Sequence, residues 1–199
     1  MEVNTKVNLS GLVLDNPVIP ASGTFGFGKE YVDFYDINIL GSISIKGTTV
    51  QRRKGNPQPR IAECYSGLIN SVGLENPGME NVIQKELKDL EMIYRKPVIA
   101  NISGFSVEEY VTLAKEMDKV DNVSIIEVNI SCPNVDHGGL AFGTNADNVT
   151  NKENQRSHNK TYLYETQSKR NRHQRNCTRS TRRWCRWYFT HQYTDGYAH

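Results

Sequence analysis

Short apolar runs that alternate with helical segments constrain the fold of this chain more than any other feature of its sequence. Each run is long enough for a buried strand, and helical spacing of apolar residues appears between the runs. Strands that alternate with helices along a chain form parallel βαβ units. We therefore expect an α/β fold built on a parallel sheet. The predicted strands are residues 17–21, 40–45, 97–102 and 123–130.

A short hairpin is expected before the first of these strands. Residues 3–9 alternate in polarity, and Gly11 separates them from a second apolar run. Ser106 marks the start of a helix, since Glu109 follows at the spacing of a capping box. A long polar connection over residues 51–78 follows the second strand, and loops of that length inside a compact domain are usually functional. The predicted helices are residues 29–35, 79–93, 106–117 and 145–150.

Polar or reactive side chains lie at or just beyond the end of every predicted strand. They are Ser22, Lys46, Asn101, and then Asn129 with Cys132. The carboxyl ends of parallel strands form the ligand-binding face of such folds. An enzyme whose site is assembled by several strands therefore explains the pattern better than a structural module does. Taken singly, each residue has a plainer explanation, such as a free cysteine packed as a small hydrophobe.

Charge divides the chain into two unlike segments. Residues 1–150 hold 13 Lys and Arg against 19 Asp and Glu, a net charge of −6, whereas residues 151–199 hold 11 against 3, a net charge of +8. The second segment contains Leu163 and no Ile, Val or Met, so it buries too little apolar area to offset chain entropy. We expect residues 1–150 to have the composition of a globular segment that forms part of a larger fold, and residues 151–199 to form a basic, irregular and disordered tail.

Seven motifs follow one another in residues 1–150: PASGTFGFGKE, IKGTT, GNPQPR, NSVGLENPG, ANISG, NISCPN and GGLAFGTN. This ordered set resembles the class 1 dihydroorotate dehydrogenases, and most closely the catalytic subunit of the NAD-linked class 1B enzymes. The resemblance implies a TIM barrel with an N-terminal hairpin, of which this segment would supply about the first four strands. It also implies an FMN-dependent enzyme that oxidises (S)-dihydroorotate to orotate in pyrimidine biosynthesis.

The same resemblance assigns roles to individual residues. Cys132 would be the general base that takes the C5 proton while hydride leaves C6 for the flavin. Lys46 would place positive charge beside the flavin and would also reach the substrate. FMN contacts would come from Ser22, Lys46, Gly47, Asn101 and Asn129. Substrate contacts would come from Lys46, Asn70, Ser71, Val72, Gly73, Leu74, Asn129 and Asn134.

A partner subunit that carries FAD and a [2Fe–2S] cluster and passes electrons to NAD is also implied by the resemblance. Cys64, Cys132, Cys177 and Cys185 show no spacing typical of a cluster, a metal site or a disulfide framework, so we expect FMN alone on this chain. The family suggests a homodimer or a heterotetramer with the partner subunit. We expect a cytoplasmic protein that binds no membrane, because neither a signal peptide nor a run of about 20 apolar residues is visible.

The tail departs from the family pattern, because a TIM barrel has eight strands in about 250 residues. Back-translation of residues 160–172 with allowed codons, read one base later, can spell KPIYMKLSPNVTD, which resembles the family's fifth strand. Residues 184–199 treated in the same way can spell GADGISLINTLMGMR, which resembles the sixth. We interpret residues 151–199 as translation in a shifted frame and expect this chain to be inactive. The alternative is a tail whose arginines and aromatic residues bind nucleic acid non-specifically.

Overall fold

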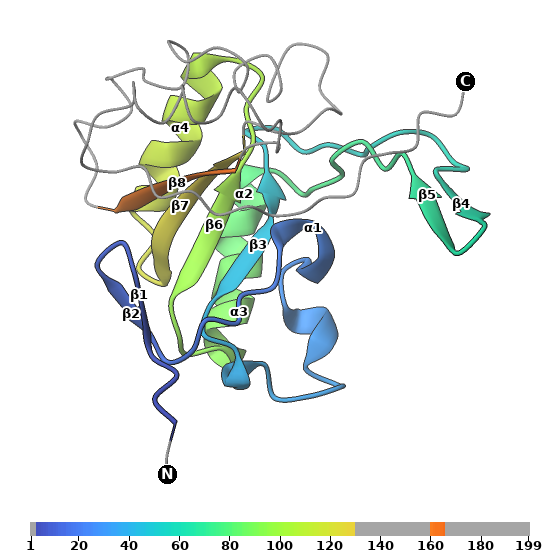
Figure 1. The fold of residues 1–199 in the computed structure, drawn as a ribbon. Coiled ribbons are helices and arrows are strands. Elements are labelled where there is room, and N and C mark those ends of the chain that lie inside the picture. Colours follow the sequence, from blue (N-terminus) through green and yellow to red (C-terminus); the bar gives the residue numbers. More distant parts are fainter. Residues whose placement is uncertain (1–2, 130–159, 166–199) are drawn as a thin grey trace, which may run out of the picture.

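A parallel sheet forms the centre of the computed structural model, which describes residues 3–129 and 160–165 of this chain. Its strands lie in the order β3-β6-β7-β8, running from light blue to orange in Figure 1. Every neighbouring pair in this sheet is parallel, which confirms the prediction from the alternating sequence. The strands are β3 (Ile43–Thr48), β6 (Val98–Ile102), β7 (Val123–Asn129) and β8 (Thr161–Glu165).

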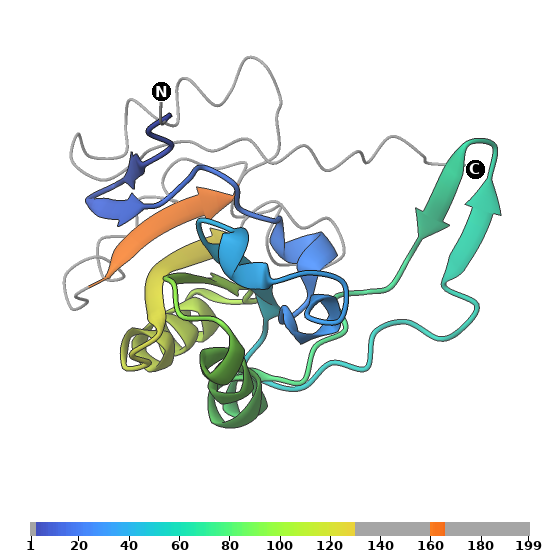
Figure 2. The same ribbon diagram turned by 90° about the horizontal axis from the view of Figure 1, so that it is seen from below.

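Helices cover one face of this sheet, as Figure 2 shows. The predicted helix over residues 79–93 is present, and its middle turn is π-helical. The next helix begins where the capping box predicts, because the Ser106 side chain accepts a hydrogen bond from the backbone N–H of Glu109. None of the helices in the described part of the chain has the length and apolar character that a bilayer span requires. The segments are α2 (Met79–Asn81), η3 (Val82–Glu86), α3 (Leu87–Ile93) and α4 (Val107–Asp118).

The predicted N-terminal hairpin lies against the opposite face of the sheet (Figure 2). Its side chains Leu9 and Leu14 are buried against Ile99, Ile125 and Leu163. Because side chains alternate between the faces of a strand, these three sheet residues point away from the helices. The hairpin therefore covers part of this face with apolar contacts. It consists of the antiparallel strands β1 (Val7–Leu9) and β2 (Leu12–Leu14).

The segment between the hairpin and β3 differs from its prediction. Residues 17–21 do not form a strand, because Pro17 and Pro20 lack the backbone N–H that a ladder requires. The predicted helix over residues 29–35 is reduced to one 3-10 turn, since the residues after it are mostly β-branched or aromatic and weak helix formers. The short elements here are α1 (Ser22–Phe25), η1 (Lys29–Tyr31) and η2 (Ile37–Ile39).

Strand β3 starts later and runs further than the predicted residues 40–45. Lys46 was expected to follow the strand, yet it lies inside it. The pairing with β6 changes register between Ile45 and Thr48, so the strand passes through Lys46 and Gly47 as an irregularity and then continues. Lys46 therefore sits on a paired strand and not in a loop.

Strand β8 corrects the prediction that the whole tail from residue 151 is irregular. Thr161–Glu165 is rich in β-forming residues and pairs with β7 along its full length. Tyr162 joins the core under the helices, whereas Leu163 joins the cluster under the hairpin. Next to this strand, the Lys160 ammonium donates to the carbonyl of Met117 in the last turn of α4 at 3.0 Å and to that of Val120, just beyond the helix, at 2.6 Å. The low apolar content of the tail predicted that it buries too little surface to fold, but Tyr162 and Leu163 both lie in the core.

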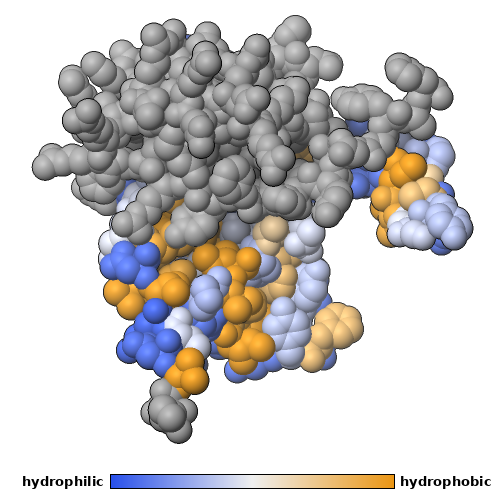
Figure 3. All heavy atoms as spheres, viewed as in Figure 1, coloured by the Kyte–Doolittle hydropathy of each residue, from blue (hydrophilic) through white to orange (hydrophobic). Residues whose placement is uncertain are grey.

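A second hairpin projects from the body of the molecule (Figure 1). The sequence predicted only a polar connection here, but β4 (Ile61–Cys64) and β5 (Gly67–Asn70) pair antiparallel. All of their residues are exposed, and Figure 3 shows hydrophobic residues gathered on this hairpin. The prediction missed the strands because Arg, Asn and Pro before them dominate the local composition.

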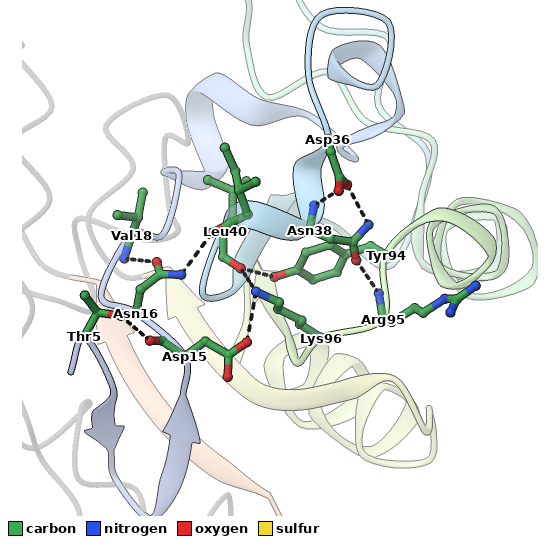
Figure 4. A network of polar contacts seen from close by, with 11 residues as sticks. Thr5, Asp15, Asn16, Val18, Asp36, Asn38, Leu40, Tyr94, Arg95 and Lys96 are labelled. Atoms are coloured by element: carbon green, nitrogen blue, oxygen red, sulfur yellow. Dashed lines mark hydrogen bonds and ion pairs between the residues drawn. The ribbon is translucent and has the colours of Figure 1, made fainter. Parts of the chain in front are cut away.

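A polar network joins the segments that precede β3 and β6 (Figure 4). Lys96 pairs with the Asp15 carboxylate at 3.0 Å and donates to the carbonyl of Leu40 at 3.0 Å. The Tyr94 hydroxyl reaches the same carbonyl at 3.5 Å. Asn38 accepts a hydrogen bond from the backbone N–H of Arg95 at 3.1 Å. These contacts fix the start of β3 relative to the start of β6.

Tyr94→Phe is expected to reduce the loss of stability at alkaline pH. Burial, and secondly the Asp15 charge, raise the pKa of the Tyr94 phenol above its ordinary value. Above about pH 10 the unfolded chain therefore releases a proton that the folded chain keeps, so the unfolding free energy falls as pH rises. Urea unfolding at pH 8 and pH 11 would measure the difference. Tyr65→Phe, at a fully exposed position, is the control and should leave the pH dependence unchanged.

Candidate active site

The carboxyl ends of three neighbouring strands bring together most of the predicted cofactor-binding residues. Lys46 and Gly47 lie near the end of β3, Asn101 lies near the end of β6, and Asn129 ends β7. Asn101 is fully buried and Asn129 is nearly so, while Lys46 is half-buried. Since the strands are adjacent and parallel, these residues lie together at the carboxyl end of the sheet.

The face of the sheet that carries the hairpin changes from apolar to polar along its strands. On β6, Ile99 contacts the hairpin cluster and Asn101 follows two residues later on the same face. On β7, Ile125 is followed in the same way by Glu127 and then Asn129. On this face, apolar side chains therefore occupy the amino ends of the strands, and polar side chains occupy the carboxyl ends.

Glu127 holds this polar group together, and sequence reasoning missed it. One oxygen of its carboxylate, Oε2, accepts hydrogen bonds from the Ser44 hydroxyl at 2.8 Å and from Asn101 Nδ2 at 2.7 Å. These bonds connect β3, β6 and β7 side by side. The signal was present, because a carboxylate at an inward position of an apolar strand requires hydrogen-bonding partners. From the sequence, that position is predicted only as part of a buried strand.

The bond to Glu127 sets the orientation of the Asn101 amide. With Nδ2 directed to the carboxylate, Oδ1 lies beside Gly47, where an added Cβ would be 3.0 Å away. The same Cβ would be 3.1 Å from the Ser103 hydroxyl, which is buried and has no hydrogen-bond partner among the residues that the structure describes. A side chain at position 47 would therefore crowd two polar groups at the strand ends.

The glycine-rich segment that contains Ser22 lies beside Lys46. Ser22 is buried at the start of α1. Beyond α1, the carbonyl of Gly26 accepts a hydrogen bond from the Lys46 backbone N–H at 2.8 Å. Gly26 has a φ of 63°, a conformation that a residue with a side chain rarely adopts. The glycine thus allows this segment to turn and attach to β3 at the site.

The predicted substrate loop, residues 70–74, approaches the site with its carboxyl end. Leu74 Cδ1 lies 3.3 Å from where a Cβ on Gly47 would be. Asn70 and Ser71 instead continue from the projecting hairpin and are exposed. Val72 is half-buried and Gly73 is buried. The loop therefore joins the solvent-exposed hairpin to the end of β3.

Two predicted site residues, Cys132 and Asn134, lie outside the residues that the structure describes. So does the predicted helix over residues 145–150. Their roles stay predictions.

Comparison with known proteins identifies the family. The sequence profile of the dihydroorotate dehydrogenases matches residues 4–163. This chain belongs to the dihydroorotate dehydrogenase family. The match reaches into β8, whereas the sequence motifs had suggested that the resemblance ends near residue 150.

Relatives within the dihydroorotate dehydrogenase family are close in sequence over the matched part. The chain is 58% identical over 140 residues to the dihydroorotate dehydrogenase B (NAD(+)) catalytic subunit of Bacillus cytotoxicus, covering 70% of this chain and 45% of that protein. The protein of the same name from Bacillus thuringiensis is 57% identical with the same coverage. The chain thus spans about half the length of the curated relatives that it matches.

A solved structure supports the fold. The dihydroorotate dehydrogenase of Eimeria tenella, determined in complex with ferulenol, superposes with a TM-score of 0.62 at 18% identity. The match covers 82% of this chain and 52% of that chain. The parallel sheet with its outer helices is therefore part of a TIM barrel, as predicted.

Replacing Glu127 is expected to weaken the fold at the site. Glu127→Leu removes the acceptor shared by Ser44 and Asn101, both of which are buried. We expect the unfolding free energy to fall by about 2–4 kcal/mol, and by less in Glu127→Gln, which keeps one acceptor oxygen. Urea unfolding would measure both. Glu91→Leu, at an exposed position on α3, is the control, and an equal loss there would contradict the assignment.

Proposed function

We propose that this chain carries the amino-terminal half of the active site of an NAD-linked dihydroorotate dehydrogenase. The substrate would be (S)-dihydroorotate and the product orotate, in the biosynthesis of pyrimidines. The observation that carries the proposal is the polar cluster at the strand ends. It occurs in a chain whose relatives are named dihydroorotate dehydrogenase B (NAD(+)), catalytic subunit. Because the chain spans 45% of those relatives, the complete site needs strands that the described residues do not supply.

The described residues fit FMN. Gly47 leaves room for close approach at the end of β3, and the buried Ser103 hydroxyl beside it has no partner among the residues that the structure describes. We infer that Ser22, Lys46, Gly47, Asn101 and Asn129 contact the cofactor. FMN, when bound, supplies the hydride acceptor for the reaction. Lys46 would balance negative charge on the flavin when it is reduced.

Substrate recognition would combine the loop over residues 70–74 with amides at the strand ends. An Asn amide offers both donors and acceptors, which suits a ring with alternating N–H and C=O groups. Asn70, Asn129 and Asn134 would supply these amides, and Lys46 would meet the substrate from β3. Cys132 would remove the proton from C5, because a thiolate near a cation is a suitable base at neutral pH.

Electrons would leave through a second subunit. The name of the relatives includes NAD and the words catalytic subunit, which supports a separate electron-transfer partner for this chain. We propose that the partner holds FAD and a [2Fe–2S] cluster, and that the assembly is a heterotetramer or contains a homodimer of the catalytic chain. We also propose that it works in the cytoplasm.

The division at residue 150 stays a proposal. Residues 1–150 would be the FMN-binding half-barrel, and most of residues 151–199 would be a basic extension translated in a shifted frame. Nucleotide sequence across codons 145–200 tests this proposal. An open frame one base later that encodes barrel-like strands would support it, and a closed frame would contradict it.

A fusion protein tests the proposed function. Residues 1–150 of this chain would be joined to the carboxyl-terminal half of the Bacillus cytotoxicus relative. We expect a yellow protein that binds FMN and oxidises dihydroorotate, whereas residues 1–199 alone should show no turnover. Absorbance and product formation would be measured, with Lys88→Ala in the fusion as a control at an exposed position. A folded, colourless fusion would contradict the proposal.

Cys132→Ala in the fusion is expected to lower the rate of flavin reduction by about 10²–10⁴-fold, the usual effect of losing a general base. FMN content should stay unchanged, because the thiol is proposed to meet the substrate and not the cofactor. Rapid mixing with dihydroorotate would give the rate. Cys64→Ala, at an exposed position on the projecting hairpin, is the matched control. An unchanged rate in Cys132→Ala would remove this residue from the mechanism.

A further inference from the structure

We propose that Asn76 is a positioning residue that fixes the substrate loop, residues 70–74, against the end of β3. The inference rests on the proposed function, since that assigns dihydroorotate to this loop. Asn76 itself would touch neither substrate nor cofactor. It would act by holding the backbone of Leu74 in place.

The Asn76 side chain uses its full hydrogen-bonding capacity while only 3% exposed. Oδ1 accepts from the backbone N–H of Thr49 at 3.2 Å and of Gly78 at 3.0 Å. Nδ2 donates to the carbonyl of Leu74 at 2.9 Å and to Thr49 Oγ1 at 3.0 Å. The Thr49 hydroxyl lies 3.1 Å from Asn76 Oδ1 and 2.5 Å from the carbonyl of Gln51, which is the nearer acceptor for its hydrogen, so its oxygen can accept from Asn76 Nδ2. Only one orientation of the amide satisfies all four contacts.

The backbone that Asn76 holds is in an unfavourable conformation. Leu74 has a φ of 57° and follows Gly73, whose φ is 78°. A leucine in the left-handed region is strained, and such strain persists only where the surroundings impose it. The bond from Asn76 Nδ2 to the Leu74 carbonyl is one of those restraints. It turns the Leu74 side chain toward Gly47 on β3.

The two ends of the loop are held very differently. At the amino end, Asn56 donates to the Ser71 carbonyl at 2.7 Å, and two backbone bonds of 2.9 Å join Ser71 to Arg60 and Asn56 to Val72, but no buried side chain takes part. At the carboxyl end, Asn76 is buried and also pairs through its backbone with Arg53, at 3.0 and 3.1 Å. Thr49 lies three residues after Lys46, so Asn76 joins the loop to the strand that carries the proposed substrate-binding lysine. Errors of about 1 Å in such positions can cost about 10²-fold in rate.

Hydrogen exchange on the 199-residue chain tests the structural part. Asn76→Asp keeps an acceptor for Thr49 and Gly78 but replaces the donor to Leu74 with a carboxylate oxygen. We expect the amides of residues 70–78 to exchange about tenfold faster or more. Asn122→Asp is the matched control, since Asn122 Nδ2 donates to the Leu87 carbonyl at 2.9 Å, and it should leave this segment unchanged. Unchanged exchange in Asn76→Asp would overturn the inference.

Thr49→Val covers the case in which Asn76→Asp does not fold. It removes one partner of Nδ2 and leaves the bond to Leu74, so exchange of residues 70–78 should rise by a smaller factor. No rise in Thr49→Val, with Asn76→Asp unfolded, would count against the inference.

Kinetics of the fusion protein test the functional part. Asn76→Asp should raise KM for dihydroorotate about tenfold or more, with FMN content unchanged and a smaller change in kcat. A fusion that turns over dihydroorotate with an unchanged KM in Asn76→Asp would overturn the inference and leave the proposed function intact. A fusion that binds no FMN would instead reject the proposed function, while hydrogen exchange would still decide whether Asn76 orders the loop.

Discussion

Parallel pairing of β3, β6 and β7 is the constraint on which the rest of the structure depends. It places three carboxyl ends at one edge, so residues far apart in sequence, from Lys46 to Asn129, become neighbours. Apolar residues on alternate positions hold the helices on one face and the hairpin on the other. This packing therefore fixes the positions of the polar residues at the carboxyl ends of the strands.

Polar groups then refine what the apolar packing has positioned. Glu127 connects three strands through one carboxylate oxygen, and Asn76 connects the end of β3 to the loop that follows β5. Both side chains are neighbours of proposed ligand-binding residues and not members of that set. A site built in this way depends on residues that contact no ligand, because each amide must present a defined atom to the ligand.

The sequence was sufficient for the fold class, the hairpin, the helices expected over residues 79–93 and 106–117, and the gathering of polar residues at the strand ends, since these follow from periodicity, capping and family motifs. It was insufficient where tertiary contacts override local composition. The pairing of β3 with β6, for example, continues past the register change at Lys46 and Gly47. The missing strand over residues 17–21 has a local cause instead, because Pro17 and Pro20 lack the backbone N–H that a ladder requires. Glu127 and Asn76 were missed because their partners are distant in sequence. Tyr162 and Leu163 form a strand in a segment whose average composition predicts none.

The alternation of Tyr162 and Leu163 has a consequence for β8. One of these side chains belongs to each face of the sheet, so both layers of the core hold the strand at once. A slip by a single residue would turn the phenol ring toward the hairpin and the leucine toward the helices, and would mispair every rung with β7. Tyr162 and Leu163, which differ in shape and lie on opposite faces, therefore set the register of β8 against β7, although the composition of the surrounding sequence does not predict a strand.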